Sequence, residues 1–267
     1  MRSIFSGLLI GVACILPGAS GGMLAVSFGL YQPALDALVH FFRDPKQHIR
    51  FLAPPALGGA AGVIIGALWL SDAMARHERL MLFLFTGLIT GGIPGLIRQA
   101  HGYEPFRTGH LLTLLGGMLC ALPLCLPGAA GAEAAALSAV QAFLAGVLEG
   151  IGTVVPGIST SILLIRLGWY KAYLAAVSCF EAGRLALIGA GFALSAFACL
   201  RAVQRVFEKH AAHALYGVLG FVLISVAAVF PGFTKGMHFW AEAAALAAGV
   251  AAVRLMERSE NNRGVTK

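Results

Sequence analysis

Apolar residues dominate this chain, and short polar segments divide them into runs of about the length that crosses a bilayer as a helix. The longest runs cover approximately residues 53–70, 80–97, 111–126, 178–200, 214–230 and 239–253. Basic or polar linkers separate these runs, and residues 258–267 form a polar tail. The pattern predicts an all-α polytopic membrane protein, because only helices and closed barrels satisfy their backbone polar groups in lipid.

Two further segments, residues 7–31 and 146–170, repeat one another without a gap. In each copy an apolar run of helix length is broken by Pro-Gly-x-Ser, and a second apolar run follows. Nine of 25 aligned positions are identical: Gly7/Gly146, Leu9/Leu148, Gly11/Gly150, Pro17/Pro156, Gly18/Gly157, Ser20/Ser159, Leu24/Leu163, Gly29/Gly168 and Tyr31/Tyr170. A break inside apolar sequence is typical of backbone that lines a polar cavity at membrane depth.

We interpret the repeated segments as re-entrant broken helical hairpins, at residues 4–39 and 137–177. The start of the first hairpin resembles a signal peptide, but the same pattern returns at Gly146, where no signal lies. Each half of the chain then holds one hairpin and three transmembrane spans. The predicted repeats are residues 1–133 and 134–257.

The basic residues favour inverted topology for these repeats. With re-entrant hairpins and a cytoplasmic N-terminus, 13 of the 19 Lys and Arg residues face the cytoplasm, against 10 if the hairpins cross the membrane. The loops at residues 40–50 and 98–110 then face the cytoplasm, and residues 71–79 and 127–133 face outward. Both termini are predicted to be cytoplasmic, in a multi-pass protein of the cell membrane.

Composition agrees with a membrane protein, since 58% of the residues are hydrophobic, 12% are charged, and the mean hydropathy is +0.83. The net charge of +7 would suggest nucleic acid as a partner for a soluble domain, but here the basic residues set topology. The five cysteines lie in apolar segments without metal-ligand spacing, so we expect no metal. No Gly-x-x-x-x-Gly-Lys loop is present, and we expect no cofactor.

The two Pro-Gly-x-Ser turns are predicted to meet near the membrane midplane and to form an anion-binding cradle. Helices that begin after each turn would direct free backbone N–H groups at the meeting point. Hydroxyls add donors, and glycines permit close approach of an oxyanion. The predicted binding residues are Pro17, Gly18, Ser20, Gly21, Gly22, Pro156, Gly157, Ser159, Thr160 and Ser161. The alternative is that these small residues only permit tight helix packing.

Charged residues within the apolar segments are few and complete the predicted site. Arg166 is expected to contact a phosphate, because a guanidinium offers bidentate donors, although snorkelling to the interface competes with this role. Glu149 either carries a coupling proton or excludes wrong anions. Glu181 and Arg184 are three residues apart and can pair on one helical face, in a structural or a functional role.

The motif GVACILPGASGG with a following GLY, and VVPGIS with a following GWY, resemble the bacterial and archaeal polyprenyl-phosphate transporter family. The resemblance covers nearly the whole chain. It implies a non-enzymatic flippase that binds undecaprenyl phosphate among the membrane lipids and moves it across the cytoplasmic membrane for reuse in cell-envelope synthesis. Family members tend to read PGxSG in both copies, whereas here Thr160 replaces the second glycine.

A second resemblance keeps an enzyme as an alternative. Glu149-Gly150, Pro156 and Ser159-Thr160 are similar to the signature of undecaprenyl-diphosphate phosphatases. That signature has a second glutamate where Thr153 stands and a histidine where this chain has Ile162 and Leu163. An anion channel or exchanger also stays open, and a lateral groove to the lipid would distinguish a lipid transporter from it. The oligomeric state, including a homo-oligomer, is left open.

Overall fold

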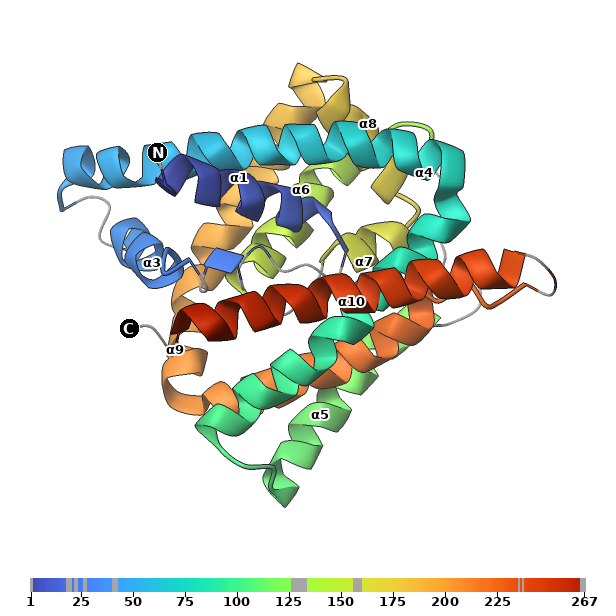
Figure 1. Ribbon diagram of the computed structural model, residues 1–267. Coiled ribbons are helices and arrows are strands. Elements are labelled where there is room, and N and C mark those ends of the chain that lie inside the picture. The colour runs from blue at the N-terminus through green and yellow to red at the C-terminus, as the bar shows by residue number, and fades with distance from the viewer. Residues whose placement is uncertain are drawn as a thin grey trace.

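The structure is a computed structural model, and it describes residues 2–17, 21, 24–25, 28–39, 43–125, 134–155, 160–234, 236 and 238–264. Every regular element in these ranges is helical (Figure 1). The first half of the chain contains α1 (Arg2–Ile15), α3 (Tyr31–Val39), α4 (Pro45–Tyr103), α5 (Thr108–Ala121) and the 3-10 helix η1 (Leu122–Cys125). The second half contains α6 (Ala139–Val154), α7 (Thr160–Arg166), α8 (Tyr170–Ser178), α9 (Ala182–Val229) and α10 (His238–Gly264).

Three stretches of the described chain are long and apolar enough to cross a membrane. They are Pro45–Tyr103, Thr108–Cys125 and Ala182–Val229. Two shorter apolar helices, Ile4–Ile15 and Ala139–Val154, are the first arms of the two predicted hairpins. The prediction of an all-helical protein with membrane-crossing helices is therefore confirmed.

Each of the two longest helices contains one sharp kink. In α4 the kink is at His77 (φ −139°, ψ 44°), and in α9 it is at His210 (φ −140°, ψ 39°). The sequence predicts a separate linker at residues 71–79, but the chain stays helical there except for the single non-helical residue. The span predicted at residues 178–200 begins later, at Ala182, because Phe180 adopts a positive φ of 56° and ends α8.

Each hairpin's first arm crosses a long helix of its own half with backbone against backbone. A Cβ atom on Gly58 of α4 would overlap the carbonyl oxygen of Ile4 in α1. At the equivalent place, a Cβ atom on Gly191 of α9 would overlap the carbonyl oxygen of Phe143 in α6. Only glycine permits this approach, which is the usual basis of close helix crossings in lipid.

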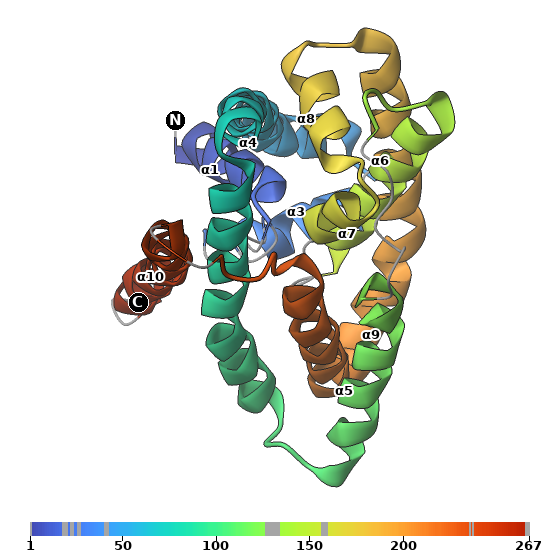
Figure 2. The same cartoon turned by 90° about the vertical axis from the view of Figure 1, so that its right-hand side faces the viewer.

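The last helix of each half packs instead on the long helix of the other half. Gly87 of α4 lies against the Leu246 carbonyl of α10, and Gly220 of α9 lies against the Leu114 carbonyl of α5. Figure 2 shows α10 beside α4 and α5 beside α9. The two halves therefore make the same contacts in sequence-equivalent places, and they exchange their closing helices.

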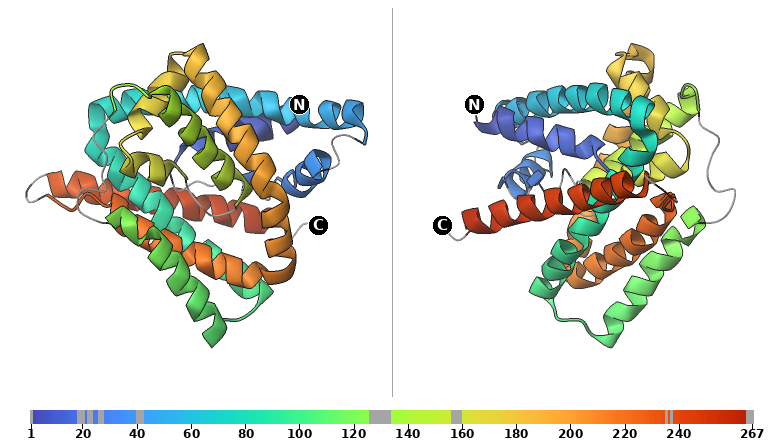
Figure 3. Two further views of the ribbon diagram at one scale, coloured as in Figure 1. Left: turned by 180° about the vertical axis from the view of Figure 1, so that it is seen from behind. Right: turned by 45° about the vertical axis from the view of Figure 1, so that its right-hand side comes forward.

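Both termini and the kink of α9 lie on one side of the molecule, at the left of Figure 1, whereas the kink of α4 and the start of α10 lie on the other side. The view from behind in Figure 3 shows the same arrangement. Between these sides, α1, α4 and the second hairpin meet in an apolar core that includes Ile15, Leu70, Phe85, Leu164 and Leu174.

We predict that Gly58→Ala lowers the unfolding temperature in detergent by at least about 3 °C, because overpacking costs roughly 1–3 kcal/mol. The neighbouring Gly59 is the matched control, since its Cβ would have the Gly7 carbonyl oxygen 3.7 Å away as its nearest neighbour. Gly59→Ala should leave the unfolding temperature nearly unchanged. Equal losses in the two variants would contradict the assigned crossing.

Candidate functional site

The candidate site lies where the two hairpins meet, and the structure describes part of it. Helix α1 ends at Ile15, just before Pro17, and α6 ends at Val154, six residues before α7 begins at Thr160. Predicted site residues that lie outside the described residues are Gly18, Ser20, Gly22, Pro156, Gly157 and Ser159. Those that the structure describes are Pro17, Gly21, Glu149, Thr160, Ser161, Arg166, Glu181 and Arg184.

The carbonyl oxygen of Ile15 joins the two hairpins. It accepts hydrogen bonds from the Ser161 hydroxyl of α7 at 3.2 Å and from the Tyr170 hydroxyl of α8 at 2.8 Å. The last carbonyls of a helix have no partner within the helix, and at a buried position each needs a donor from elsewhere. The second hairpin thus supplies the donors that the broken end of the first hairpin lacks.

This junction changes the interpretation of two residues. The sequence predicts that Ser161 binds an anion, whereas its hydroxyl proton is here given to the backbone of α1. The sequence pattern does not predict Tyr170 as a site residue, although the identity of Tyr31 and Tyr170 at the end of each repeat is a signal for it. Both side chains are buried, so the junction is shielded from solvent.

Glu149 is a buried carboxylate beside this junction, with 8% of its surface exposed. The Thr160 hydroxyl donates to Glu149 Oε2 at 3.0 Å. Cys14, Tyr170 and Tyr173 are close enough to interact electrostatically with this carboxylate. Among the described residues Glu149 has no ion-pair partner, so its charge is not matched by a neighbouring cation.

Small residues allow the broken segments to approach one another. A Cβ atom on Gly152 would overlap the Thr160 side chain, so glycine is needed for Thr160 to lie over the last turn of α6. A Cβ atom on Gly21 would overlap the Cys14 sulfur. The sequence predicts that Gly21 gives room to an oxyanion, whereas the described contacts of Gly21 are with α1.

Arg166 occupies the last turn of α7 and is partly buried. Its Nε atom is buried, and among the described residues it has no hydrogen-bond partner. Burying an N–H donor of a charged group without an acceptor is costly. Within the described residues, the Nε–H donor of Arg166 therefore has no acceptor.

Glu181 and Arg184 form the pair that their spacing predicts. Arg184 Nη1 donates to Glu181 Oε2, and Arg184 Nε donates to the Leu137 carbonyl oxygen at 2.7 Å. Both side chains are about one-third exposed, with values of 34% and 36%. These contacts hold the start of α9 against the segment before α6.

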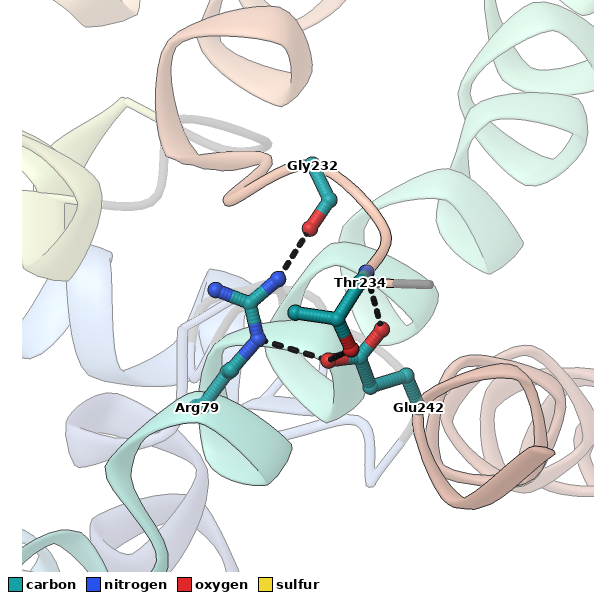
Figure 4. A network of polar contacts seen from close by, with 4 residues as sticks. All are labelled: Arg79, Gly232, Thr234 and Glu242. Carbon is teal, nitrogen blue, oxygen red and sulfur yellow. Dashed lines mark hydrogen bonds and ion pairs between the residues drawn. The ribbon is translucent and has the colours of Figure 1, made fainter. Parts of the chain in front are cut away.

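Two polar clusters outside the hairpins were not selected from the sequence. In the first, Glu242 of α10 accepts from Arg79 and from Thr234, while Arg79 also donates to the Gly232 carbonyl (Figure 4). In the second, His110 of α5 is almost fully buried against Tyr216 of α9. In the described parts of the chain, no group of three His, Cys, Asp or Glu side chains could hold a metal ion.

Comparison with known proteins identifies the family. A family model described as undecaprenyl phosphate translocase-like matches residues 10–245. A polyprenyl-phosphate transporter of Staphylococcus aureus is 26% identical over 251 residues, which cover 89% of this chain and 89% of that protein. A polyprenyl-phosphate transporter of Vibrio cholerae is 23% identical over 247 residues, which cover 86% of this chain and 78% of that protein.

No solved structure matches the chain. The family match nonetheless includes most of the first hairpin, all of the second hairpin and all of α4, α5 and α9, and it spans well over half of the sequence. The chain therefore belongs to the undecaprenyl phosphate translocase-like family.

Proposed function

We propose that this protein moves undecaprenyl phosphate, or a related polyprenyl phosphate, across the cytoplasmic membrane so that the lipid carrier can be reused. The observation that carries the proposal is the family match over residues 10–245, together with relatives that are named polyprenyl-phosphate transporters. The long apolar helices support a membrane location. The protein acts as a transporter and catalyses no bond cleavage.

The phosphate headgroup is proposed to bind at the junction of the two hairpins. Arg166 supports this placement because its buried Nε has an unmet donor and because guanidinium groups suit phosphate oxygens. The repeated Pro-Gly-x-Ser turns, with Ser20 and Ser159, supply further donors in the proposed cradle. Thr160 acts through Glu149, to which its hydroxyl is bonded.

Glu149 has two roles that fit its surroundings. A buried carboxylate without a cationic partner in the described residues either exchanges a proton during transport or repels divalent anions that lack a lipid tail. Replacement by glutamine separates these roles. Loss of the response of transport to a pH gradient indicates proton exchange, whereas loss of discrimination against inorganic phosphate indicates repulsion.

The two repeats are proposed to have inverted topology in the membrane, with re-entrant hairpins. The equivalent contacts of Gly58 and Gly191, and of Gly87 and Gly220, support a two-fold relation between the halves. The side of the molecule that carries both termini also carries the segments predicted to be cytoplasmic (Figure 1). We place the repeat boundaries at residues 1–133 and 134–257.

The topology predicts that a cysteine at position 47 is protected from a membrane-impermeant maleimide added to intact cells. Gln47 is exposed near the start of α4, so accessibility on its own side is not limiting. The control is a cysteine at position 76, which is also exposed and should react from outside. Both cysteines are introduced into protein that lacks the native cysteines. Labelling of position 47 from outside would contradict the model of re-entrant hairpins with a cytoplasmic N-terminus.

We predict that Arg166→Ala slows leaflet exchange of undecaprenyl phosphate in vesicles by about ten- to a hundredfold. The reason is that a hydrogen bond to a charged group contributes roughly 1.5–3 kcal/mol. Arg166→Lys should recover part of the rate, since one ammonium cannot reproduce the planar fork. Arg76→Ala is the control, because Arg76 forms only an exposed pair with Asp72, and it should transport at the wild-type rate. A wild-type rate for Arg166→Ala would remove Arg166 from the site.

The purified protein should release no phosphate from undecaprenyl diphosphate, because the second glutamate and the histidine of the phosphatase signature are both absent. Thr153, at the position of the phosphatase signature's second glutamate, uses its hydroxyl to donate to the Glu149 carbonyl at 2.8 Å. Ile162, near the position of the histidine, is fully buried. The measurement is phosphate release by wild-type protein and by Glu149→Gln. Release that this variant abolishes would identify the protein as an enzyme.

A further inference from the structure

The exchanged helices place two different polar clusters in equivalent positions. Helix α5 corresponds to α10 because the contacts of Leu114 recur at Leu246, and α4 corresponds to α9 because the kink at His77 recurs at His210. Under the same correspondence, His110 of α5 is equivalent to Glu242 of α10. Each residue lies near the start of its closing helix. Each contacts the long helix of the other half at a residue that follows the kink of that helix.

The Glu242 closure consists of Arg79, Gly232, Thr234 and Glu242 (Figure 4). Glu242 is 1% exposed, and it accepts from Arg79 Nε at 2.6 Å, from the Thr234 backbone N–H at 2.9 Å and from the Thr234 hydroxyl at 2.7 Å. Arg79 also donates to the Gly232 carbonyl. Charge and hydrogen bonds thus hold α10 and the segment before it to α4.

The His110 closure consists of Glu104, Arg107, His110, His213 and Tyr216. The His110 side chain is 1% exposed, and its ring stacks on Tyr216 at 4.7 Å between centroids and meets His213 edge-on at 4.5 Å. His110 Nδ1 accepts the Arg107 backbone N–H at 3.1 Å. The proton of the neutral ring is therefore on Nε2, which lies 3.5 Å from Glu104 Oε2.

The two closures share one type of contact, and the group that accepts the hydrogen bond differs between them. In each, a buried side chain of the closing helix accepts a backbone N–H from the segment that precedes that helix. At Glu242 the acceptor is a carboxylate, a group that ordinarily titrates at about pH 4. At His110 the acceptor is an imidazole, which becomes a donor at both ring nitrogens when it takes up a second proton.

We propose that the His110 closure is a pH-sensitive gate of the transport path, whereas the equivalent Glu242 closure stays shut over the same pH range. A second proton on His110 would go to Nδ1, so that two donors, Nδ1–H and the Arg107 N–H, would face each other. The bond that caps α5 is then lost, and the charge on the His110 ring lies against the His213 ring of α9, with 4.5 Å between centroids, so the start of α5 separates from α9. Acidification opens this end of the molecule.

The groups near His110 come from α9, from α4 and from the segment just after α4. Most of them favour opening when His110 takes up a second proton. His213 of α9 lies close enough to disfavour a second positive charge, and His210 lies beyond it at 6.1 Å. The His101 ring of α4 lies 6.2 Å from the Tyr216 ring between centroids. Glu104, just after α4, attracts a charged His110, but its side chain is 51% exposed and solvent screens the attraction.

The chain itself provides a matched variant. Helix α6 begins with a capping box in which Gln141, three residues after Ser138, accepts the Ser138 backbone N–H at 2.9 Å. His110 holds the same position relative to Arg107. His110→Gln should therefore keep the cap and the closure while removing the titration.

The test uses spin labels in full-length protein in lipid nanodiscs, after replacement of the native cysteines. One pair, at Thr108 and Lys209, spans the His110 closure; the equivalent pair, at Trp240 and Arg76, spans the Glu242 closure, and all four positions are exposed. When the pH falls from 8 to 5, the population of molecules with a longer distance between the first pair of labels should at least double. The distance between the second pair should not change. In His110→Gln both distances should be independent of pH.

Three results would overturn the proposal: no response of the first pair, an equal response of both pairs, or a response that persists in His110→Gln. If His110→Gln does not fold, the comparison of the two pairs in otherwise wild-type protein still decides. That the closure gates transport rests on the proposed function, so the rate of undecaprenyl phosphate exchange is measured in parallel. Absence of transport at every pH, with a normal distance response, would refute the transport function and leave the closure standing.

Discussion

The structure depends on satisfying backbone groups that are released where helices break inside apolar sequence. The Ile15 carbonyl at the end of α1 is such a group, and lipid offers it no donor. Ser161 and Tyr170 supply donors from the other half of the chain, so neither hairpin is complete without the other. The same requirement that restricts breaks in membrane helices thus forces the two repeats together and places polar groups at their junction.

Glycine makes the rest of the packing possible. In lipid the hydrophobic effect does not drive helices together, so they associate through close van der Waals contact, which small residues permit. Gly58 and Gly191 fix the hairpins on the long helices, and Gly87 and Gly220 fix the exchanged closing helices. Because the exchange ties each half to the other, a movement of one closing helix changes the surroundings of both halves. The kinks at His77 and His210 lie in the two long helices on which the closing helices pack.

Local pattern predicted the helices, the breaks and the Glu181/Arg184 pair, because each depends on residues close together in the chain. It did not predict the exchange of closing helices or the pairing of Arg79 with Glu242, which are 163 residues apart. It also assigned Ser161 to the ligand, since spacing identifies a hydroxyl donor without showing which acceptor receives its proton. The charges at residues 71–79 predict a linker, but these residues are part of the helix α4.

Duplication provides the frame of the site, but the chemistry of the two copies differs. In the gapless alignment Glu149 stands opposite Ile10, and Arg166 stands opposite Ser27. Thr160 and Ser161 stand opposite Gly21 and Gly22. The second hairpin is therefore charged and hydroxyl-rich where the first is small or apolar. For the phosphate site proposed above, a two-fold frame with one set of charges suits a single phosphate group, because two equal sets of charges would bind two anions or retain one too tightly to release it.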